Sequence, residues 1–178
     1  MKLPWRRGDA PSLTTEARAA VSGRGEKVLA SVGEQYSGAT LVATTGHLTL
    51  VDDDGTVLER RPWVEVNSAT WEPMTGTLTV NWTDAIRSSQ WTLGELGHGL
   101  AAVVHERVAY SVVVAVPLEK DEREIGRAAI RRDAVTGELF PQLVWGRGGR
   151  GRDPEKVAYG RRVLEHLCEQ AGIAPPGP

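Results

Sequence analysis

Between residues 39 and 93, apolar and polar residues alternate in short runs, which is the pattern of half-buried β-strands. Turn signals separate the runs, and Asp53-Asp54-Gly55 is the clearest, because Asp-Gly supplies the positive φ angles of a tight hairpin. One strand is expected to resume after Pro62 and to run over residues 63–66. Six or seven short strands at this spacing predict an antiparallel barrel or sandwich.

The hydrophobic period changes after residue 99. Leu100, Val103, Val104 and Val108 share one helical face, so a helix is expected to follow the strands. Alternation then returns in three runs, at 109–118, 126–132 and 139–145, which predict an antiparallel meander. In the middle run, Ala128 and Ile130 are expected to point inward and the arginines outward.

A C-terminal helix is predicted after residue 152. Asp153 is a good N-cap and Pro154 suits the first helical position, while Gly172 followed by Ile173 is typical of a helix C-terminus. Gly160 would allow this helix to lie close to a sheet. The apolar stripe that would face the sheet consists of Val157, Leu164, Leu167, Cys168 and Ala171.

The segment before residue 25 is rich in Gly, Arg, Ser and Pro. It is expected to be a loose arm over residues 1–24, with at most a short helix near Thr14 to Val21. The predicted organisation is therefore this arm, a β-rich part with its helix over 25–108, and the meander plus helix over 109–178, packed together as one globule.

Four short segments together resemble the bacterial PH-like and GRAM-like modules over residues 25–108. They are Gly25-Glu26-Lys27-Val28-Leu29-Ala30, residues 41–48 (LVATTGHL), residues 61–66 (RPWVEV) and Leu78-Thr79-Val80. The resemblance implies a partly open antiparallel β-barrel of seven strands, capped by a helix. The whole chain is also similar to a set of small actinobacterial proteins of no assigned activity, through residues 106–113 (ERVAYSVV).

Taken together, these features predict an α+β fold: a PH-like partly open barrel capped by a helix, then a three-stranded antiparallel meander and a C-terminal helix. PH-like modules commonly bind lipids, peptides or proteins and rarely catalyse reactions. Members that bind phosphoinositides place Lys and Arg in the first hairpin. The matching loop here, residues 44–47 (TTGH), contains neither, which argues against phosphoinositide binding.

Composition and charge narrow the function classes. The net charge is −2, and a single cysteine allows neither an intramolecular disulfide nor a multi-cysteine metal cluster. No export signal or membrane-length apolar run is visible, so a cytoplasmic protein without membrane insertion is expected. His98 and His105 lie seven residues apart and are interpreted as surface residues of a helix, and Cys168 as a small buried hydrophobe. No catalytic motif, metal site or cofactor motif is found, so no enzyme activity is predicted.

The sharpest local feature is an Arg/Gly-rich loop over residues 146–152. Glycines leave the backbone open and arginines present planar donor groups that suit phosphates, while a neighbouring tryptophan offers a stacking surface. A flexible connector between strand and helix is the plainer interpretation of the same loop. The candidate ligand-binding residues are Arg131, Arg132, Trp145, Arg147, Arg150 and Arg152.

Two functional hypotheses follow from the sequence. The first is a non-catalytic interaction module that binds a partner protein, or a second copy of itself, through a sheet edge or the groove beside the helix at 97–107. The second is an accessory protein that binds a nucleic acid or another anion through the Arg/Gly-rich loop. The negative net charge and the absence of a second basic patch favour the first.

Overall fold

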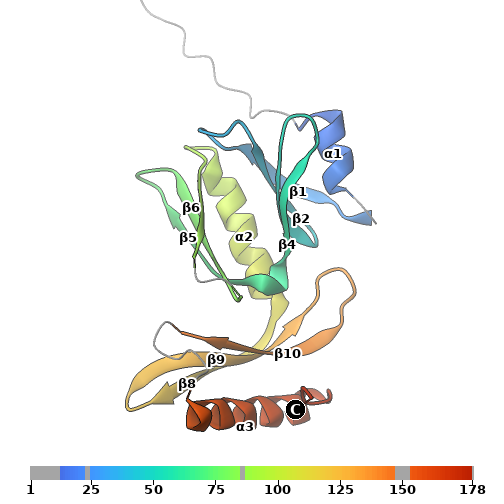
Figure 1. Ribbon diagram of the computed structural model, residues 1–178. Helices are drawn as coiled ribbons and strands as arrows, with labels where there is room; N and C mark the ends of the chain where they lie inside the picture. The colour runs from blue at the N-terminus through green and yellow to red at the C-terminus, as the bar shows by residue number, and fades with distance from the viewer. Residues whose placement is uncertain (1–12, 23–24, 85–86, 147–152, 178) are drawn as a thin grey trace, which may run out of the picture. The chain divides into compact units, whose positions relative to one another are not determined.

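In the computed structural model, which describes residues 13–22, 25–84, 87–146 and 153–177, three antiparallel sheets and three α-helices follow one another along the chain (Figure 1). The predicted α+β class is confirmed. None of the sheets in the described part of the chain closes into a barrel. By its internal contacts the chain divides into two compact units. The first unit consists of Met1–Arg61, Ala69–Val80 and Ser88–His105. The second unit consists of Pro62–Ser68, Asn81–Arg87 and Glu106–Pro178.

The first sheet has four strands in the order β1-β2-β3-β4. Its strands are β1 (Val28–Gly33), β2 (Thr40–Thr44), β3 (His47–Val51) and β4 (Val57–Pro62). Every residue of β2 is buried, because β2 is a central strand covered on both faces. Strand β1 pairs with β2 in antiparallel register, with Val32 opposite Leu41.

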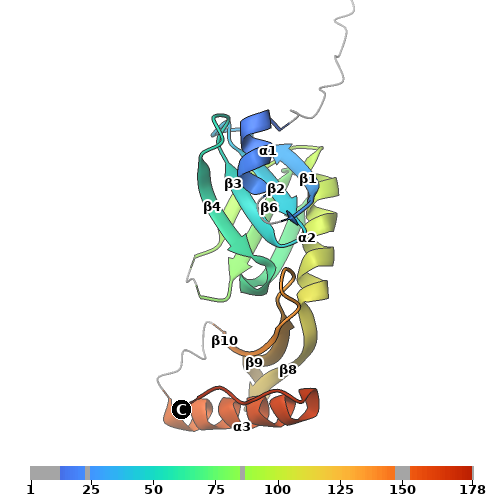
Figure 2. The same cartoon turned by 90° about the vertical axis from the view of Figure 1, so that its right-hand side faces the viewer.

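A short helix, α1 (Thr15–Val21), lies within the segment expected to be a loose arm. Thr14 caps it by accepting a hydrogen bond from the amide of Ala17. Ala17 and Val21 pack with Val42 and Val51 of the first sheet (Figure 2). The helix allowed for near Thr14 to Val21 is thus present, and it belongs to a hydrophobic core.

The second sheet has the order β5-β6-β7, with β5 (Val66–Glu72), β6 (Thr77–Trp82) and β7 (Ser89–Thr92). The expected strand over 63–66 is wrong, since Trp63–Glu65 forms a single 3-10 turn, η2. Trp63 and Val64 are both buried, whereas consecutive residues of a strand point to opposite faces. The helix after β7 is α2 (Gly97–Ser111). It continues three residues further than the pattern predicted, so the next strand begins at residue 112 and not at 109.

The third sheet is the predicted meander, in the order β10-β9-β8, and belongs to the second unit. Its strands are β8 (Val112–Lys120), β9 (Arg123–Arg132) and β10 (Leu139–Trp145). Helix α3 (Pro154–Ala171) covers one face of this sheet (Figures 1 and 2). The core between them contains Leu118, Ile130 and Leu164, all at most 2 % exposed.

Helix α3 begins and ends as the sequence predicts. The Asp153 side chain accepts from the amide of Glu155, and Gly172 has a left-handed backbone with φ 68°. The amide of Ile173 donates to the carbonyl of Cys168, which completes the C-terminal capping motif. A Cβ atom on Gly160 would lie 2.9 Å from the ring of Trp145, so the glycine permits close packing of α3 on the sheet, as predicted.

Candidate functional site

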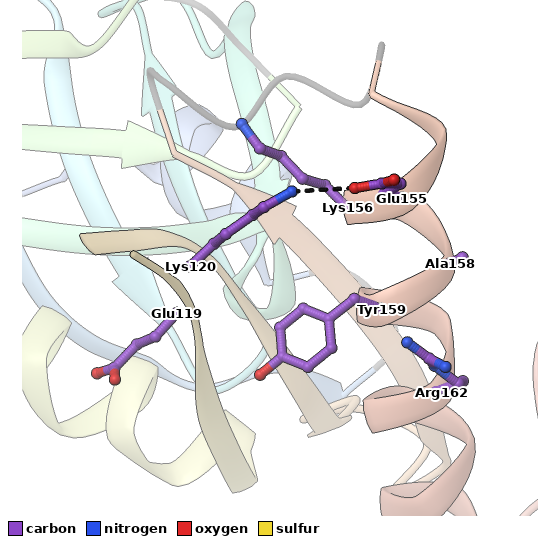
Figure 3. Close-up of a pocket in the computed structure, with 7 residues that line it drawn as sticks. All are labelled: Glu119, Lys120, Glu155, Lys156, Ala158, Tyr159 and Arg162. Carbon is purple, nitrogen blue, oxygen red and sulfur yellow. Dashed lines mark hydrogen bonds and ion pairs between the residues drawn. The ribbon is translucent and has the colours of Figure 1, made fainter. Parts of the chain in front are cut away.

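A groove runs between the end of β8 and the first half of α3, with a volume of about 550 Å³ (Figure 3). Its lining residues are Glu119, Lys120, Glu155, Lys156, Ala158, Tyr159 and Arg162. All of them belong to the second unit. A volume of this size is in the range that accommodates small ligands or a few side chains of a partner.

The helical repeat places one stripe of α3 in this groove. Glu155, Tyr159 and Arg162 are spaced i, i+4 and i+7, so they lie on one side of the helix. The buried stripe of α3, which includes Gly160, Leu164, Leu167 and Cys168, faces the sheet instead. Figure 3 shows the Tyr159 ring pointing from α3 toward β8, where it forms an apolar floor.

A tight turn positions the β8 side of the groove. Lys120 pairs with Arg123 across a two-residue loop, and both loop residues, Asp121 and Glu122, have positive φ angles of 53° and 60°. These angles describe a type I′ hairpin turn, which holds the two strand ends in register. Lys120 Nζ then reaches α3 and donates to Glu155 Oε2 at 3.3 Å (Figure 3).

The charges of the groove are only partly neutralised. The pKa of Lys120 is raised by its hydrogen bond to Glu155 and by the nearby charges of Asp153 and Glu155. Lys156 Nζ lies 3.9 Å from Asp153 Oδ2. Arg162 and Glu119 have no ion-pair partner among the residues that the structure describes. The groove therefore presents one unpaired cation and one unpaired anion beside an aromatic floor.

The groove is open to solvent. Glu119, Glu155, Ala158 and Arg162 are exposed, and Lys120, Lys156 and Tyr159 are half-buried. Reaction chemistry gains from a site that excludes water, because charges interact more strongly there. An open groove with an aromatic floor and charged rims is instead suited to receiving the side chains of another polypeptide.

The two edges of the third sheet are poorly suited to adding another strand. Pro117 lies in edge strand β8 and Pro141 in edge strand β10. The amide of Asp133 donates to the carbonyl of Glu138, so these two residues form a hydrogen-bonded pair at the β9–β10 turn. Hydrogen-bonded and non-hydrogen-bonded pairs alternate along an antiparallel ladder, so Pro141, three residues after Glu138, is in a non-hydrogen-bonded pair with Ile130 and its nitrogen faces away from β9. A proline there removes a donor that an added strand would need.

Arg131 corrects one sequence prediction. It was expected to point outward and was a candidate ligand-binding residue, but it is only 4 % exposed. Its Nη2 atom lies 2.9 Å from the carbonyl oxygen of Trp63, 3.1 Å from that of Val66 and 2.7 Å from Ser111 Oγ. The alternation along β9 correctly predicts that Arg131 and Ile130 point to opposite faces of the sheet. The face that carries Arg131 is nevertheless covered, by residues 62–68 of the same unit. Burial, together with the charge of Arg127, lowers the pKa of Arg131 to about 10.

Arg132 and Trp145 are half-buried. The Arg132 guanidinium lies 5.5 Å from the ring centroid of Tyr110, which also stacks with Arg107 at 5.1 Å. The Trp145 ring packs against the core beneath α3 and contacts Gly160. The structure therefore places Arg132 and Trp145 in different surroundings and does not bring them together with Arg131 as one cluster. Arg147, Arg150 and Arg152 lie outside the described residues, so the Arg/Gly-rich loop as a binding site stays a prediction.

The remaining titratable candidates have structural surroundings. Cys168 is fully buried in the core under α3, as the sequence predicted, and burial together with the charge of Glu165 raises the pKa of its thiol. His98 and His105 are exposed on α2. Across the described ranges, no group of three or more His, Cys, Asp or Glu side chains is arranged to hold a metal ion.

Sequence reasoning missed the groove. Tyr159 lies off the apolar stripe of α3, and Lys120 lies in a run of charged residues, so no hydrophobic pattern singles out either of them. A single aromatic residue on the polar side of a helix is ordinary on a protein surface, so Tyr159 alone gives no sequence signal of a groove. Lys120 of β8, which forms the other wall of the groove, precedes Glu155 of α3 by 35 residues, and only the folded structure shows that the two lie side by side.

Comparison with protein-family models and with curated proteins gives no match for this chain. No helix in the described ranges is both long and apolar enough to cross a lipid bilayer. The function must therefore be argued from the chain's own geometry.

Proposed function

We propose that the chain is a non-catalytic interaction module that binds a polypeptide partner in the groove between β8 and α3. The observation that carries this proposal is the half-buried Tyr159 ring at the floor of an open groove, with Arg162, which pairs with none of the described residues, on its rim. Tyrosine and arginine are, with tryptophan, the residue types enriched among those that dominate the binding energy of protein interfaces.

We also propose that β1–β7 and α2 form a PH-like module, to which the third sheet and α3 are appended. The support is the order of elements, which is a four-stranded sheet, a three-stranded sheet and then a helix. In this scheme the partner does not add a strand to the third sheet, because each of its edges carries a proline. The partner binds through side chains that enter the groove.

The charges around the groove define the partner's chemistry. Arg162 has no ion-pair partner in the described part of the chain and can donate to a carboxylate, and Lys156 Nζ lies as far as 3.9 Å from Asp153 Oδ2. The preferred partner is therefore a segment with an aromatic or aliphatic side chain next to an acidic residue that can reach Arg162.

A random peptide library displayed on phage, selected on the immobilised full chain, tests this proposal. Enriched peptides are expected to combine an apolar residue with Asp or Glu. Tyr159→Ala should weaken their binding about 30-fold, which corresponds to a loss of roughly 2 kcal/mol for a dominant interface residue.

The matched control uses two adjacent arginines of α3. Arg162→Glu places a like charge next to the acidic peptide, whereas Arg161→Glu makes the same change at an exposed residue that does not line the groove. Only the first variant should lose binding. Peptides that bind the Tyr159→Ala and Arg162→Glu variants as tightly as the wild type would overturn the proposal.

A further inference from the structure

Three of the large apolar side chains that the first unit exposes lie on neighbouring loops. Met74 is 92 % exposed and Tyr36 is 84 % exposed, and Leu96 follows at 51 %. Tyr36 lies in the β1–β2 loop, Met74 in the β5–β6 loop and Leu96 between β7 and α2. Single exposed apolar residues are ordinary, whereas several on adjoining loops mark an interaction surface.

Backbone contacts hold these three loops together. The amide of Gln35 donates to the carbonyl of Thr92 at 2.9 Å, and the amide of Leu93 donates to the carbonyl of Gly76 at 2.7 Å. A Cβ atom on Gly76 would lie 2.6 Å from the backbone of Gly94. The three exposed side chains therefore extend from loops whose backbones are fixed to one another within a few residues. We call Tyr36, Met74 and Leu96 the apolar tip.

The apolar tip has an acidic border. Glu34, Glu72 and Glu95 lie within two residues of Tyr36, Met74 and Leu96, and the stretches 34–38, 72–77 and 92–98 contain no Lys or Arg. Burial would raise the pKa of Glu34, but hydrogen bonds from Ser37, Tyr36 and Thr92 outweigh it and lower this pKa. The border therefore has three glutamates and no basic residue in these stretches.

We propose that the apolar tip is a second docking surface, which binds a polypeptide segment with a large apolar residue flanked by Lys or Arg. Such a segment covers the three exposed side chains and neutralises the three glutamates. An anionic lipid surface is the wrong partner, because the acidic border repels it. The apolar tip lies in the first unit and the groove in the second, so this surface is distinct from the proposed groove in location and in the charge of its partner.

The same phage-displayed peptide library tests this inference when the enriched peptides are sorted by variant. Peptides that bind the wild type but not the Tyr36→Ser/Met74→Ser double variant should combine a basic residue with an apolar one. Fluorescence anisotropy of synthetic copies should show that they bind the double variant at least ten-fold more weakly than the wild type. Glu95→Lys should weaken the same peptides, and added salt should do so too. These exposed positions allow substitution with little effect on folding, which thermal unfolding of each variant verifies.

Leu58→Ser is the matched control, because Leu58 is 52 % exposed but lies on β4. It should leave the basic peptides bound. Four results would overturn the inference: no enriched peptide sensitive to the double variant, sensitive peptides that are acidic, binding of the full chain to anionic vesicles that the double variant abolishes, or a wild-type dimer that the double variant turns into a monomer. Peptides sensitive to Tyr159→Ala report only on the groove, so the two proposals can fail separately.

Discussion

Arg131 and Glu26 show how buried charges are held in this protein. Arg131 is surrounded by carbonyl and hydroxyl oxygens of the second unit. Glu26, in the first unit, has a side chain only 5 % exposed and lies between two bases, with its Oε1 atom 2.6 Å from Arg60 Nη2 and 2.9 Å from His47 Nδ1. Thr44 also donates to this carboxylate. Each group is stabilised by specific hydrogen bonds, which makes its removal costly.

Replacing Arg131 tests its structural role. Arg131→Met leaves the buried carbonyl groups of Trp63 and Val66 without this donor, so the free energy of unfolding should fall by about 2 kcal/mol. Arg127→Met, at an exposed neighbour on the same strand, should change it by less than about 0.5 kcal/mol. Urea denaturation measures both, and equal effects would show that Arg131 has no special structural role.

Glu26 makes stability depend on acid. Burial would raise its pKa, but the hydrogen bonds from Thr44 and His47 and the charges of His47 and Arg60 lower it below the ordinary value of 4.5. The contribution of the carboxylate is therefore complete above pH 4.5 and is lost as the pH falls through the lowered pKa. Unfolding of the wild type should become easier below that pH.

The Glu26→Gln variant isolates this contribution. It should lower the free energy of unfolding at neutral pH by about 3 kcal/mol, because it leaves Arg60 and His47 without their shared anion. Asp53→Asn, at an exposed residue, is the control. The difference between wild type and Glu26→Gln should shrink as the pH is lowered, and a difference that does not change with pH would contradict this account.

At the scale of elements, sequence patterns predicted well where a signal is local. The bounds of β10 and the caps of α3 depend on neighbouring residues, and both agree with the structure. The sequence predictions were wrong where tertiary contacts determine the end of an element or the burial of a residue. The pattern over 109–118 suits a strand, yet α2 extends to Ser111, whose hydroxyl donates to the carbonyl of Val108. The covered second face of β9 and the groove both require contacts between distant segments.

Gly160 sets the distance between α3 and its sheet. Gly160→Val adds atoms where a Cβ alone would lie 2.9 Å from the Trp145 ring and 3.2 Å from Leu118, so it should cost about 2 kcal/mol of stability. Ala158→Val, on the exposed side of the same helix, should cost less than about 1 kcal/mol. Thermal unfolding distinguishes them, and equal effects would show that α3 can shift away from the sheet without cost.

At the scale of the whole molecule, charge distinguishes a polypeptide-binding protein from a nucleic-acid-binding one. Arg131 is buried, so the arginines that remain from the candidate anion site are Arg132 and the three arginines of the Arg/Gly-rich loop. With a net charge of −2, the full chain should show no salt-sensitive mobility shift of DNA or RNA at low ionic strength. A shift that Arg147→Ala/Arg150→Ala/Arg152→Ala abolishes would favour the accessory-protein hypothesis.

The proposed groove is the central claim, and backbone amide NMR tests it most directly. A groove-selected acidic peptide is titrated into the full chain while amide shifts are followed. The account predicts that the largest changes fall at Glu119, Lys120 and residues 155–162, and that Tyr159→Ala removes them. Changes centred elsewhere, or changes that persist in the Tyr159→Ala variant, would contradict it.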